Sequence, residues 1–284
     1  MLPNFFVIGA AKCGTTSLSA YLQCHPEVHM AAIKETRFFA APDPRRPFGG
    51  PRVERLGDYE ALFDSQAAAR GEASPAYSQH PWRAGVPERI HALVPEARFI
   101  YLVGDPVKRL VSHYRQAVAQ TGERGTLAQI VEQPEHPFLC AGRYALQLER
   151  YLELFSPEQM LVVDQDELLR ERRSALKRIF GFLQVHPDFW SEAFEQERNR
   201  GSEHRRVSSG AYGRLRASAA RRVIDALPAE ARAKLVGTVR RAIAPPVGEV
   251  ALEPSLRRRL EDRYRPEALR LRAITGQAFA GWSV

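Results

Sequence analysis

A short run of small, hydroxyl and basic residues near the start of the chain has the composition of an anion-binding loop. The run G-A-A-K-C-G-T-T-S at residues 9–17 separates an apolar stretch from a segment with helical spacing. A loop that enters a helix in this way presents backbone N–H groups and the positive end of the helix dipole to a phosphate or sulfate. Gly14 lets the backbone approach an anion closely, and the hydroxyl groups of Thr15, Thr16 and Ser17 add donors. The alternative interpretation is a helix capped by Thr15 or Thr16 that binds no ligand.

The lysine of this loop is displaced from the position it has in loops that bind nucleoside triphosphates. Gly9 and Gly14 have the spacing of the motif G-x-x-x-x-G-K-[ST], but Thr15 stands where that motif has its lysine. Lys12 instead precedes the second glycine by two residues. From there its ammonium group can neutralise a leaving group, whereas the usual magnesium–nucleotide geometry is not supported.

Apolar segments that alternate with helical ones predict the fold that positions this loop. Three short runs rich in β-branched and aromatic residues are typical of buried strands, at residues 4–8, 98–103 and 160–163. Helical spacing occurs over residues 15–24, 107–120, 144–155 and 167–183. This alternation predicts an α/β fold: a P-loop-like three-layer domain with a central parallel β-sheet flanked by helices. From Arg214 onward the pattern is helical, with proline breaks at 228, 245–246 and 254. We therefore expect a helical C-terminal portion within a single domain of residues 1–284.

The composition is that of a globular chain and excludes several other classes. Of the 284 residues 44% are hydrophobic and 26% charged, which excludes collagen-like and wholly disordered proteins. No apolar run approaches the roughly 18 residues of a membrane-spanning helix, and the first residues lack the basic start of a signal peptide. Cys13, Cys24 and Cys140 are odd in number and lack zinc-ligand spacing, so neither a disulfide framework nor a structural metal is indicated. We expect a cytoplasmic protein.

The positive charge is concentrated in one segment. The formal net charge is +8, and residues 198–222 carry +7 of it, from eight arginines against one acidic residue, Glu203. Such a local excess is typical of a surface that binds a phosphate, a sulfated or nucleotide ligand, nucleic acid or an anionic membrane. The segment has one aromatic residue, Tyr212, and no recognisable nucleic-acid-binding module, so nucleic acid is not the expected partner. A solvated basic helix face is the remaining alternative.

Taken together, the motifs resemble those of the sulfotransferases that use 3′-phosphoadenosine 5′-phosphosulfate (PAPS). The 5′-phosphosulfate loop of that family, K-x-G-T-T-S-L, matches residues 12–18 at every fixed position. The family's second signature, R-D-P-x-x-R-x-x-S-x-Y, resembles G-D-P-V-K-R-L-V-S-H-Y at residues 104–114, where a predicted strand passes into a helix. The resemblance implies that PAPS is the sulfuryl donor. It implies two sets of donor-binding residues: Lys12, Cys13, Gly14, Thr15, Thr16 and Ser17 at the 5′-phosphosulfate, and Arg109 and Ser112 at the 3′-phosphate.

Three further segments resemble the glycosaminoglycan-type and bacterial members of that family. K-E-T-R-F-F at residues 34–39 is similar to K-E-x-x-F-F, in which the glutamate is the acceptor base, so the resemblance gives this role to Glu35. G-E-A-S-P-A-Y at residues 71–77 resembles G-E-K-[ST]-P-x-Y. N-R-G-S-E-H-R-R at residues 199–206 resembles the family's late nucleotide-contacting loop, which implies four further donor-binding residues: Arg200, Gly201, Arg205 and Arg206.

Two positions depart from the family pattern. Gly104 stands where the family usually has an arginine that pairs with the 3′-phosphate, and the basic segment 198–222 could supply the missing charge. Ala73 stands where many glycosaminoglycan-type members have a lysine near the acceptor. His80 and His113 are the nearest candidates for the histidine base of members that act on phenols and steroids, but neither has the fitting spacing.

The sequence therefore predicts a sulfotransferase that moves a sulfuryl group from PAPS to an acceptor by in-line displacement and releases adenosine 3′,5′-bisphosphate (PAP). Glu35 would take the proton of the acceptor and Lys12 would stabilise the leaving oxygen, with no metal ion required. The expected acceptor is a small molecule or glycan: a hydroxyl group, with an amine second, on a carbohydrate, lipid or secondary metabolite. Two alternatives stay open: a nucleotide-dependent kinase of related architecture, and a non-catalytic relative that binds a nucleotide or a polyanion. The sequence indicates neither which acceptor is used nor the oligomeric state.

Overall fold

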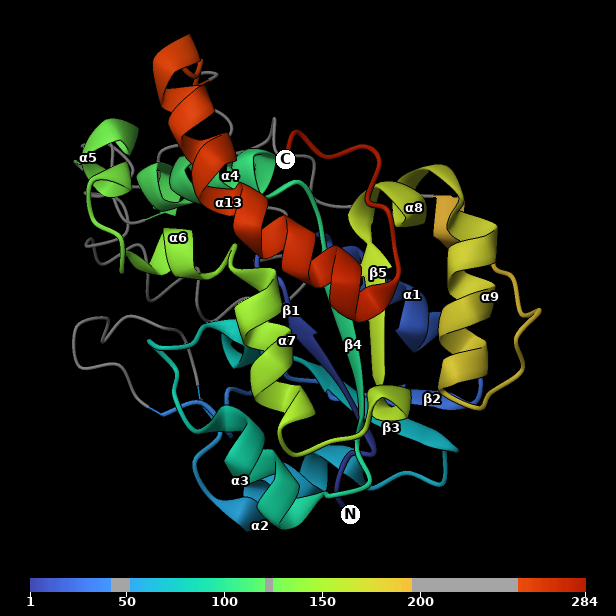
Figure 1. Cartoon of the computed structure of the whole chain (residues 1–284). Helices are drawn as coiled ribbons and strands as arrows, with labels where there is room; N and C mark the ends of the chain where they lie inside the picture. The colour runs from blue at the N-terminus through green and yellow to red at the C-terminus, as the bar shows by residue number, and fades with distance from the viewer. Residues whose placement is uncertain (42–51, 121–124, 196–249) are drawn as a thin grey trace, which may run out of the picture.

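Five parallel strands form the central sheet of the chain. The computed structural model describes residues 1–41, 52–120, 125–195 and 250–284 (Figure 1). The strands are β1 (Phe5–Gly9), β2 (Val28–Met30), β3 (Ala69–Ala73), β4 (Arg98–Val103) and β5 (Met160–Asp164). They lie in the order β2-β3-β1-β4-β5, and every adjacent pair is parallel. The first strand of the chain therefore lies in the middle of the sheet.

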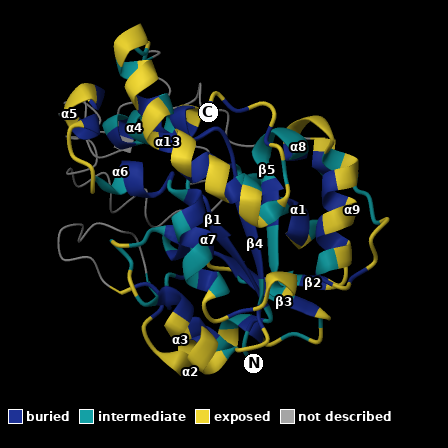
Figure 2. Ribbon diagram, viewed as in Figure 1, coloured by how far each residue is buried: buried dark blue, intermediate teal, exposed yellow. Residues whose placement is uncertain are grey.

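The apolar composition of β1 and β4 explains their central position. All five residues of β1 are buried, and so are the last five of β4; both strands are dark blue in Figure 2. A strand that is covered on both faces must be apolar at every position, because successive side chains point to opposite faces. β1 pairs with β3 on one side and with β4 on the other, so Phe5 lies opposite both Gly71 and Arg98.

The carboxyl ends of the strands share one edge of the sheet. Since all the strands are parallel, β1 leads into the 9–17 loop at the same edge where β4 leads into Gly104 and β5 into Gln165. The chain leaves β1 towards β2 on one side of the sheet, and it leaves β4 towards β5 on the other side. In open α/β sheets such a change of direction opens a crevice at the carboxyl ends, where ligands bind. The two predicted donor-binding motifs follow the adjacent strands β1 and β4, so both start at this edge of the sheet.

Helices cover both faces of the sheet. α7 (Tyr144–Leu152) and α13 (Pro254–Thr275) cross in front of it in Figure 1. The centre of the Tyr151 ring in α7 lies 5.0 Å from the centre of the Phe99 ring in β4. On the opposite face, Leu102 of β4 lies under Gly14 at the start of α1 (Thr15–Cys24). The end of α1 packs on α9 (Arg172–Phe182), where the rings of His25 and Phe180 are 4.6 Å apart. The predicted three-layer α/β fold is confirmed.

Other helices connect and flank these layers. They are α2 (Leu56–Glu60), α3 (Val86–Leu93), α4 (Pro106–Gln120), α5 (Leu127–Val131), α6 (Pro137–Cys140) and α8 (Gln165–Arg170), with short 3-10 turns at Ala61–Phe63, Pro75–Ser78, Pro157–Gln159 and Glu192–Glu195. α13 is the described part of the C-terminal portion that the sequence predicts to be helical. It begins at Pro254, because a proline in the first helical turn removes an N–H group that has no partner in the helix anyway.

Two expectations for individual elements are wrong, and two strands are unexpected. The single helix predicted over residues 167–183 is divided into α8 and α9, because Glu171 between them has a non-helical backbone (φ −122°, ψ 41°). The helix predicted to reach residue 155 ends at Leu152. β2 and β3 have no sequence counterpart in our prediction, since β2 has only three residues and β3 contains the charged residues Arg70 and Glu72.

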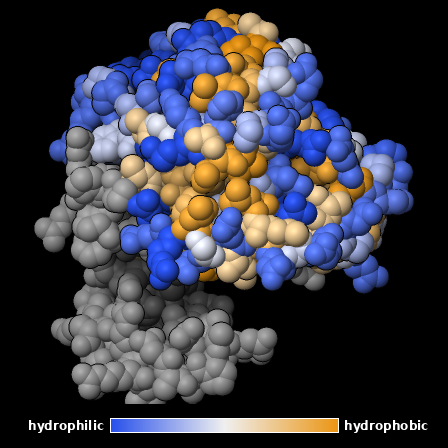
Figure 3. All heavy atoms as spheres, turned by 90° about the horizontal axis from the view of Figure 1, so that it is seen from below, coloured by the Kyte–Doolittle hydropathy of each residue, from blue (hydrophilic) through white to orange (hydrophobic). Residues whose placement is uncertain are grey.

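The described surface is mixed in polarity. Figure 3, which shows the molecule from below, has apolar atoms in the middle of the face among hydrophilic ones. Met1, Leu56 and Leu93 are among the exposed apolar side chains, and exposed apolar residues are ordinary on folded proteins. Within the described ranges, no helix combines the length and the apolar character needed to cross a membrane.

Candidate active site

The 9–17 loop ends at a helix start that no side chain caps. The N-cap residue of α1 is Gly14, whose backbone is left-handed (φ 92°), and α1 has no acidic residue in its first turn. The first N–H groups of a helix have no partner inside the helix, and the helix dipole gives this end a partial positive charge. Thr15 is buried and does not cap α1 with its side chain. The expected cap by Thr15 or Thr16 is therefore not formed, and an anion at this helix start stays a prediction.

Lys12 lies where three predicted motifs meet. Burial lowers the pKa of Lys12, and the positive charges of Lys34 and Arg109 lower it further, against an opposite effect of Cys13. Lys34 belongs to the 34–39 segment and Arg109 to the 104–114 segment, so both segments come close enough to the Lys12 ammonium group to lower its pKa. Lys12 also has a left-handed backbone (φ 76°), a conformation that costs a non-glycine residue about 1–2 kcal/mol. The protonated form of Lys12 is therefore less favoured here than it is for a lysine in water.

Cys13 faces the interior of the protein. Its side chain is fully buried, and its Sγ lies 3.5 Å from the hydroxyl oxygen of Tyr144. Burial raises the pKa of the Cys13 thiol to about 11, so the thiol stays protonated and unreactive at neutral pH. Any contact of Cys13 with a donor molecule would therefore be made by its backbone.

Glu35 is an ionised carboxylate with two cationic neighbours. Its oxygens lie 3.3 Å from Nζ of Lys34 and 2.8 Å from a guanidinium nitrogen of Arg37. Burial alone would raise the pKa of Glu35, but the hydrogen bond from Arg37 and the charges of Lys34 and Arg37 outweigh this effect and hold it below its ordinary value. The carboxylate is therefore deprotonated at neutral pH, as a base must be before it acts.

The second motif is fixed at the start of α4. One carboxylate oxygen of Asp105 accepts hydrogen bonds from the backbone N–H groups of Val107 and Lys108, both at 2.9 Å, and the other accepts one from Ser283 at 2.7 Å. Asp105 thus caps α4 and also attaches the segment after α13 to this motif. Because three backbone N–H groups bond to the Asp105 carboxylate, the guanidinium group of Arg109 bonds to other residues instead.

Arg109 is almost completely buried. Its exposed fraction is 2%; one guanidinium nitrogen donates to the carbonyl oxygen of Phe138, and another lies 3.2 Å from Nδ1 of His113. Its Nε is buried and has no hydrogen-bond partner among the described residues. Ser112 is half-buried on the same helix. The structure therefore places Arg109 beside the loop of Lys12 while its guanidinium group also holds α6 against α4.

A glutamine covers the position where the family usually has an arginine. A Cβ atom added to Gly104 would lie 2.8 Å from Oε1 and 3.3 Å from Cβ of Gln165, the first residue of α8. A longer side chain at position 104 therefore requires Gln165 to move. Gln165 directly follows β5. Its position at the carboxyl end of a predicted parallel strand is the sequence signal that indicates a residue near the ligand site.

The two histidines considered as alternative bases serve other contacts. The backbone of His80 exchanges hydrogen bonds with the side chain of Gln147, at 2.8 and 2.9 Å. The ring of His113 packs 4.1 Å from that of Phe138. Neither contact brings a histidine to Glu35.

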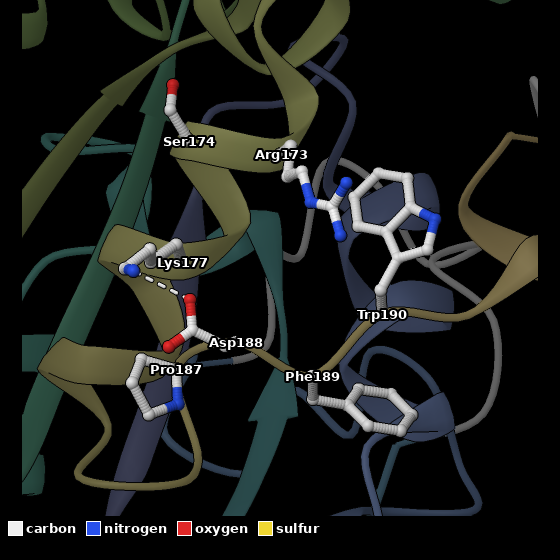
Figure 4. Close-up of a pocket in the computed structure, with 7 residues that line it drawn as sticks. All are labelled: Arg173, Ser174, Lys177, Pro187, Asp188, Phe189 and Trp190. Atoms are coloured by element: carbon white, nitrogen blue, oxygen red, sulfur yellow. Dashed lines mark hydrogen bonds and ion pairs between the residues drawn. The ribbon is translucent and has the colours of Figure 1, made fainter.

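A separate hollow lies on the outer side of α9. It has a volume of about 380 Å³ and is lined by Arg173, Ser174, Lys177, Pro187, Asp188, Phe189 and Trp190 (Figure 4). Its basic groups are already engaged: Lys177 forms an ion pair with Asp188 at 2.6 Å, and the Arg173 guanidinium lies 5.1 Å from the centre of the Trp190 ring. The hollow contains none of the predicted site residues.

Four predicted donor-binding residues, Arg200, Gly201, Arg205 and Arg206, lie outside the described residues, as does the rest of the basic segment. In the part of the chain that the structure does describe, no three His, Cys, Asp or Glu side chains are grouped so that they could hold a metal ion.

Several known sulfotransferases are similar in sequence to the chain. It is 26% identical over 209 residues to a bifunctional heparan sulfate N-deacetylase/N-sulfotransferase 1 of Caenorhabditis elegans, a match of 68% of this chain and 23% of that protein. It is 28% identical over 252 residues to carbohydrate sulfotransferase 15 of Mus musculus, covering 66% and 44% of the two chains. It is 24% identical over 289 residues to a human heparan sulfate glucosamine 3-O-sulfotransferase 3B1, covering 99% and 65%. The chain thus spans less than half the length of the first two relatives.

Solved structures and a family model also show similarity to sulfotransferases. A sulfotransferase from Alicyclobacillus acidocaldarius superposes with a TM-score of 0.69 at 25% identity, over 99% of this chain and 98% of that one. A mouse sulfotransferase complexed with PAP shares the fold, with a TM-score of 0.51 at 12% identity. Residues 3–192, more than half of the chain, match the family model described as "Sulfotransferase family". The chain therefore belongs to the sulfotransferase family.

Proposed function

We propose that the chain transfers a sulfuryl group from PAPS to a hydroxyl group of a carbohydrate. The observation that carries this proposal is the position of Lys12, whose pKa is lowered first by burial and then by the charges of Lys34 and Arg109. In this proposal the 9–17 loop, the segment of Glu35 and the second motif form one site at the carboxyl edge of the sheet. The names of the relatives, which act on heparan sulfate or other carbohydrates, support a carbohydrate acceptor.

The start of α1 fits the sulfated end of the donor. The uncapped N–H groups after Gly14 and the hydroxyl groups of Thr15, Thr16 and Ser17 would hold the 5′-phosphate and the sulfuryl oxygens. PAPS supplies an activated sulfuryl group, joined to its 5′-phosphate by a bridging oxygen. The 3′-phosphate is carried by the same ribose, and Ser112 and Arg109 would contact it; the buried Nε of Arg109 has no hydrogen-bond partner among the described residues.

Glu35 and Lys12 have complementary tasks in the transfer. The acceptor oxygen attacks sulfur while its proton passes to the Glu35 carboxylate, and the bond between sulfur and the bridging oxygen breaks. The electron pair of that bond stays on the bridging oxygen, where Lys12 would neutralise the developing charge. Burial and the neighbouring cations Lys34 and Arg109 lower the pKa of Lys12, and an anion formed beside it would favour the charged form of the lysine.

Calorimetric binding tests the donor site. Titration of the chain with PAP, and in parallel with ADP and Mg-ATP, should show binding of PAP in preference to both other nucleotides. Preferential binding of Mg-ATP would favour the kinase alternative, and binding of none of the three would contradict the proposal.

The acceptor class is tested by transfer of ³⁵S from labelled PAPS to a panel of carbohydrates. Heparosan and desulfated chondroitin offer hydroxyl groups, and de-N-acetylated heparosan adds free amines. We expect label on the hydroxyl-bearing carbohydrates. Label on the amine-bearing carbohydrate alone would change the proposed acceptor from a hydroxyl to an amine.

Introducing the missing arginine at position 104 is expected to strengthen PAP binding only when Gln165 is shortened as well. In Gly104→Arg the new Cβ would be 2.8 Å from Oε1 of Gln165, whereas Gly104→Arg/Gln165→Ala removes this obstacle. A hydrogen bond to a charged group contributes about 1.5–3 kcal/mol, so PAP should bind the double variant roughly tenfold or more tightly than the wild type. Calorimetry on both variants and on Gln165→Ala alone measures this, and equal affinity of the single and double variants would show that Gln165 is no obstacle.

A further inference from the structure

A buried carboxylate lies next to the segment that carries Glu35. Glu72, in the middle of β3, is 1% exposed. Its two oxygens accept hydrogen bonds from four hydroxyl groups: those of Thr36, Tyr59 (2.6 Å), Ser74 (2.8 Å) and Tyr77 (2.8 Å). A buried carboxylate is costly unless such donors satisfy it. Of the four donors, only Thr36 belongs to the segment of residues 34–39.

Thr36 lies between two residues with a left-handed backbone. Glu35 has φ 61° and Arg37 has φ 54°, and each such conformation costs a non-glycine residue about 1–2 kcal/mol. Strained residues of this kind persist only where the surrounding structure holds them. Thr36 itself is fully buried, and its hydroxyl group donates to Glu72. The contact with Glu72 therefore fixes the chain between the two strained residues.

Backbone contacts attach the same segment to the end of β3. The N–H of Glu35 donates to the carbonyl oxygen of Ala73 at 3.1 Å, and the N–H of Arg37 donates to the hydroxyl oxygen of Ser74 at 3.3 Å. The hydroxyl group of Ser74 in turn donates to Glu72. The direction of the Glu35 side chain, and its pairing with Arg37 at 2.8 Å, thus depend on contacts centred on Glu72.

We propose that Glu72 is a positioning residue, which acts through Thr36 to hold the Glu35 carboxylate against Arg37 in the orientation needed to receive the acceptor proton. This inference rests on the proposed function for the role of Glu35 in proton transfer. It assigns to the glutamate of the 71–77 segment a task that is distinct from contact with either substrate.

Thr36 and Tyr59 provide a matched pair of variants. Removal of Glu72 itself would leave several buried hydroxyl groups without an acceptor and can prevent folding. Thr36→Val and Tyr59→Phe instead each delete one hydroxyl donor to Glu72 and keep the shape of the side chain. Tyr59 belongs to α2, and the Phe ring preserves its stacking on Phe38 at 4.2 Å. Only Thr36→Val removes the bond between Glu72 and the 34–39 segment; it also removes the contacts of the Thr36 hydroxyl group with the hydroxyl of Tyr77 (3.3 Å) and the N–H of Phe38 (3.4 Å).

The experiment first measures the pKa of Glu35 and then the rate of sulfuryl transfer. Carboxyl ¹³C NMR titration, with the Glu35 signal assigned by its loss in Glu35→Gln, should show a higher pKa in Thr36→Val, because Glu35 loses its fixed contact with Arg37. Tyr59→Phe should leave this pKa unchanged, and Thr36→Ser should restore it. In the ³⁵S transfer assay Thr36→Val should lower kcat at least about tenfold, with KM for PAPS unchanged, since small displacements of reacting groups cost up to a hundredfold.

The outcomes separate this inference from the proposed function. Equal Glu35 pKa values in Thr36→Val and wild type, or equal shifts in Thr36→Val and Tyr59→Phe, would overturn the positioning role. The titration requires neither donor nor acceptor, so a wild type that binds no PAP contradicts the proposed function while the NMR result still decides whether Glu72 holds Glu35.

Discussion

Lys12→Ala is expected to lower turnover at least about a hundredfold. Removal of one group that stabilises charge in a transition state costs about a hundredfold to a thousandfold, and Lys12 is the cation of the 9–17 loop. Turnover is measured by ³⁵S transfer to the best acceptor of the carbohydrate panel. The control is Lys177→Ala: Lys177 is an exposed lysine paired with Asp188, and loss of such a surface ion pair has little effect.

The pH profile gives an independent measure of the same residue. Because the pKa of Lys12 is lowered, turnover should fall at alkaline pH below the range in which an ordinary lysine loses its proton. Lys12→Arg retains a cation that does not deprotonate in this range, so this variant should lose the alkaline decline. An unchanged alkaline limb in Lys12→Arg would show that another group causes it.

Glu35→Gln is expected to lower turnover at least about a hundredfold while leaving PAP affinity nearly unchanged. Glutamine keeps the size of the side chain but cannot accept the proton of the acceptor, and general base catalysis contributes about a hundredfold to ten-thousandfold. Turnover by ³⁵S transfer and PAP affinity by calorimetry separate the two effects.

A second glutamate serves as the control for the lost ion pair. Glu153 pairs with Arg150 at 2.6 Å on the surface, so Glu153→Gln removes a comparable contact away from the site and should leave turnover nearly normal. Near-normal turnover in Glu35→Gln would refute the base assignment and leave Glu35 as a surface ion-pair partner of Lys34 and Arg37.

The strands that could be predicted, β1, β4 and β5, are those with a continuous apolar run. β1 and β4 are apolar at nearly every position, because helices cover the sheet on either side, and their positions follow from composition alone. β3 escaped prediction because Glu72 makes it read as polar, although the residue is buried. Its burial depends on hydroxyl groups from Thr36 and Tyr59, which are distant in the sequence and meet Glu72 only in the folded chain.

The candidate site could be predicted in its local parts but not in its connections. The spacing of the 9–17 loop predicts a helix that starts within it, and α1 does start at Thr15 with Gly14 as its N-cap; the binding of an anion there stays a prediction. That Arg109 would be buried and bonded to the carbonyl of Phe138 does not follow from its motif, because Phe138 belongs to another helix. The position of Gln165 over Gly104 likewise results from β4 and β5 lying side by side.

The strand order has a consequence for how the chain folds. β1 is the earliest strand of the described sheet, yet both its neighbours, β3 and β4, come much later: Phe5 must find Gly71 on one side and Arg98 on the other. Pairing over such separations is slow, because loop closure must precede any gain from contact. During synthesis β1 therefore has two unpaired edges until β3 and β4 have been made. An apolar strand with unpaired edges is prone to pair with other chains. The same arrangement that places the 9–17 loop at the centre of the site makes the nascent chain vulnerable to aggregation until β4 has docked.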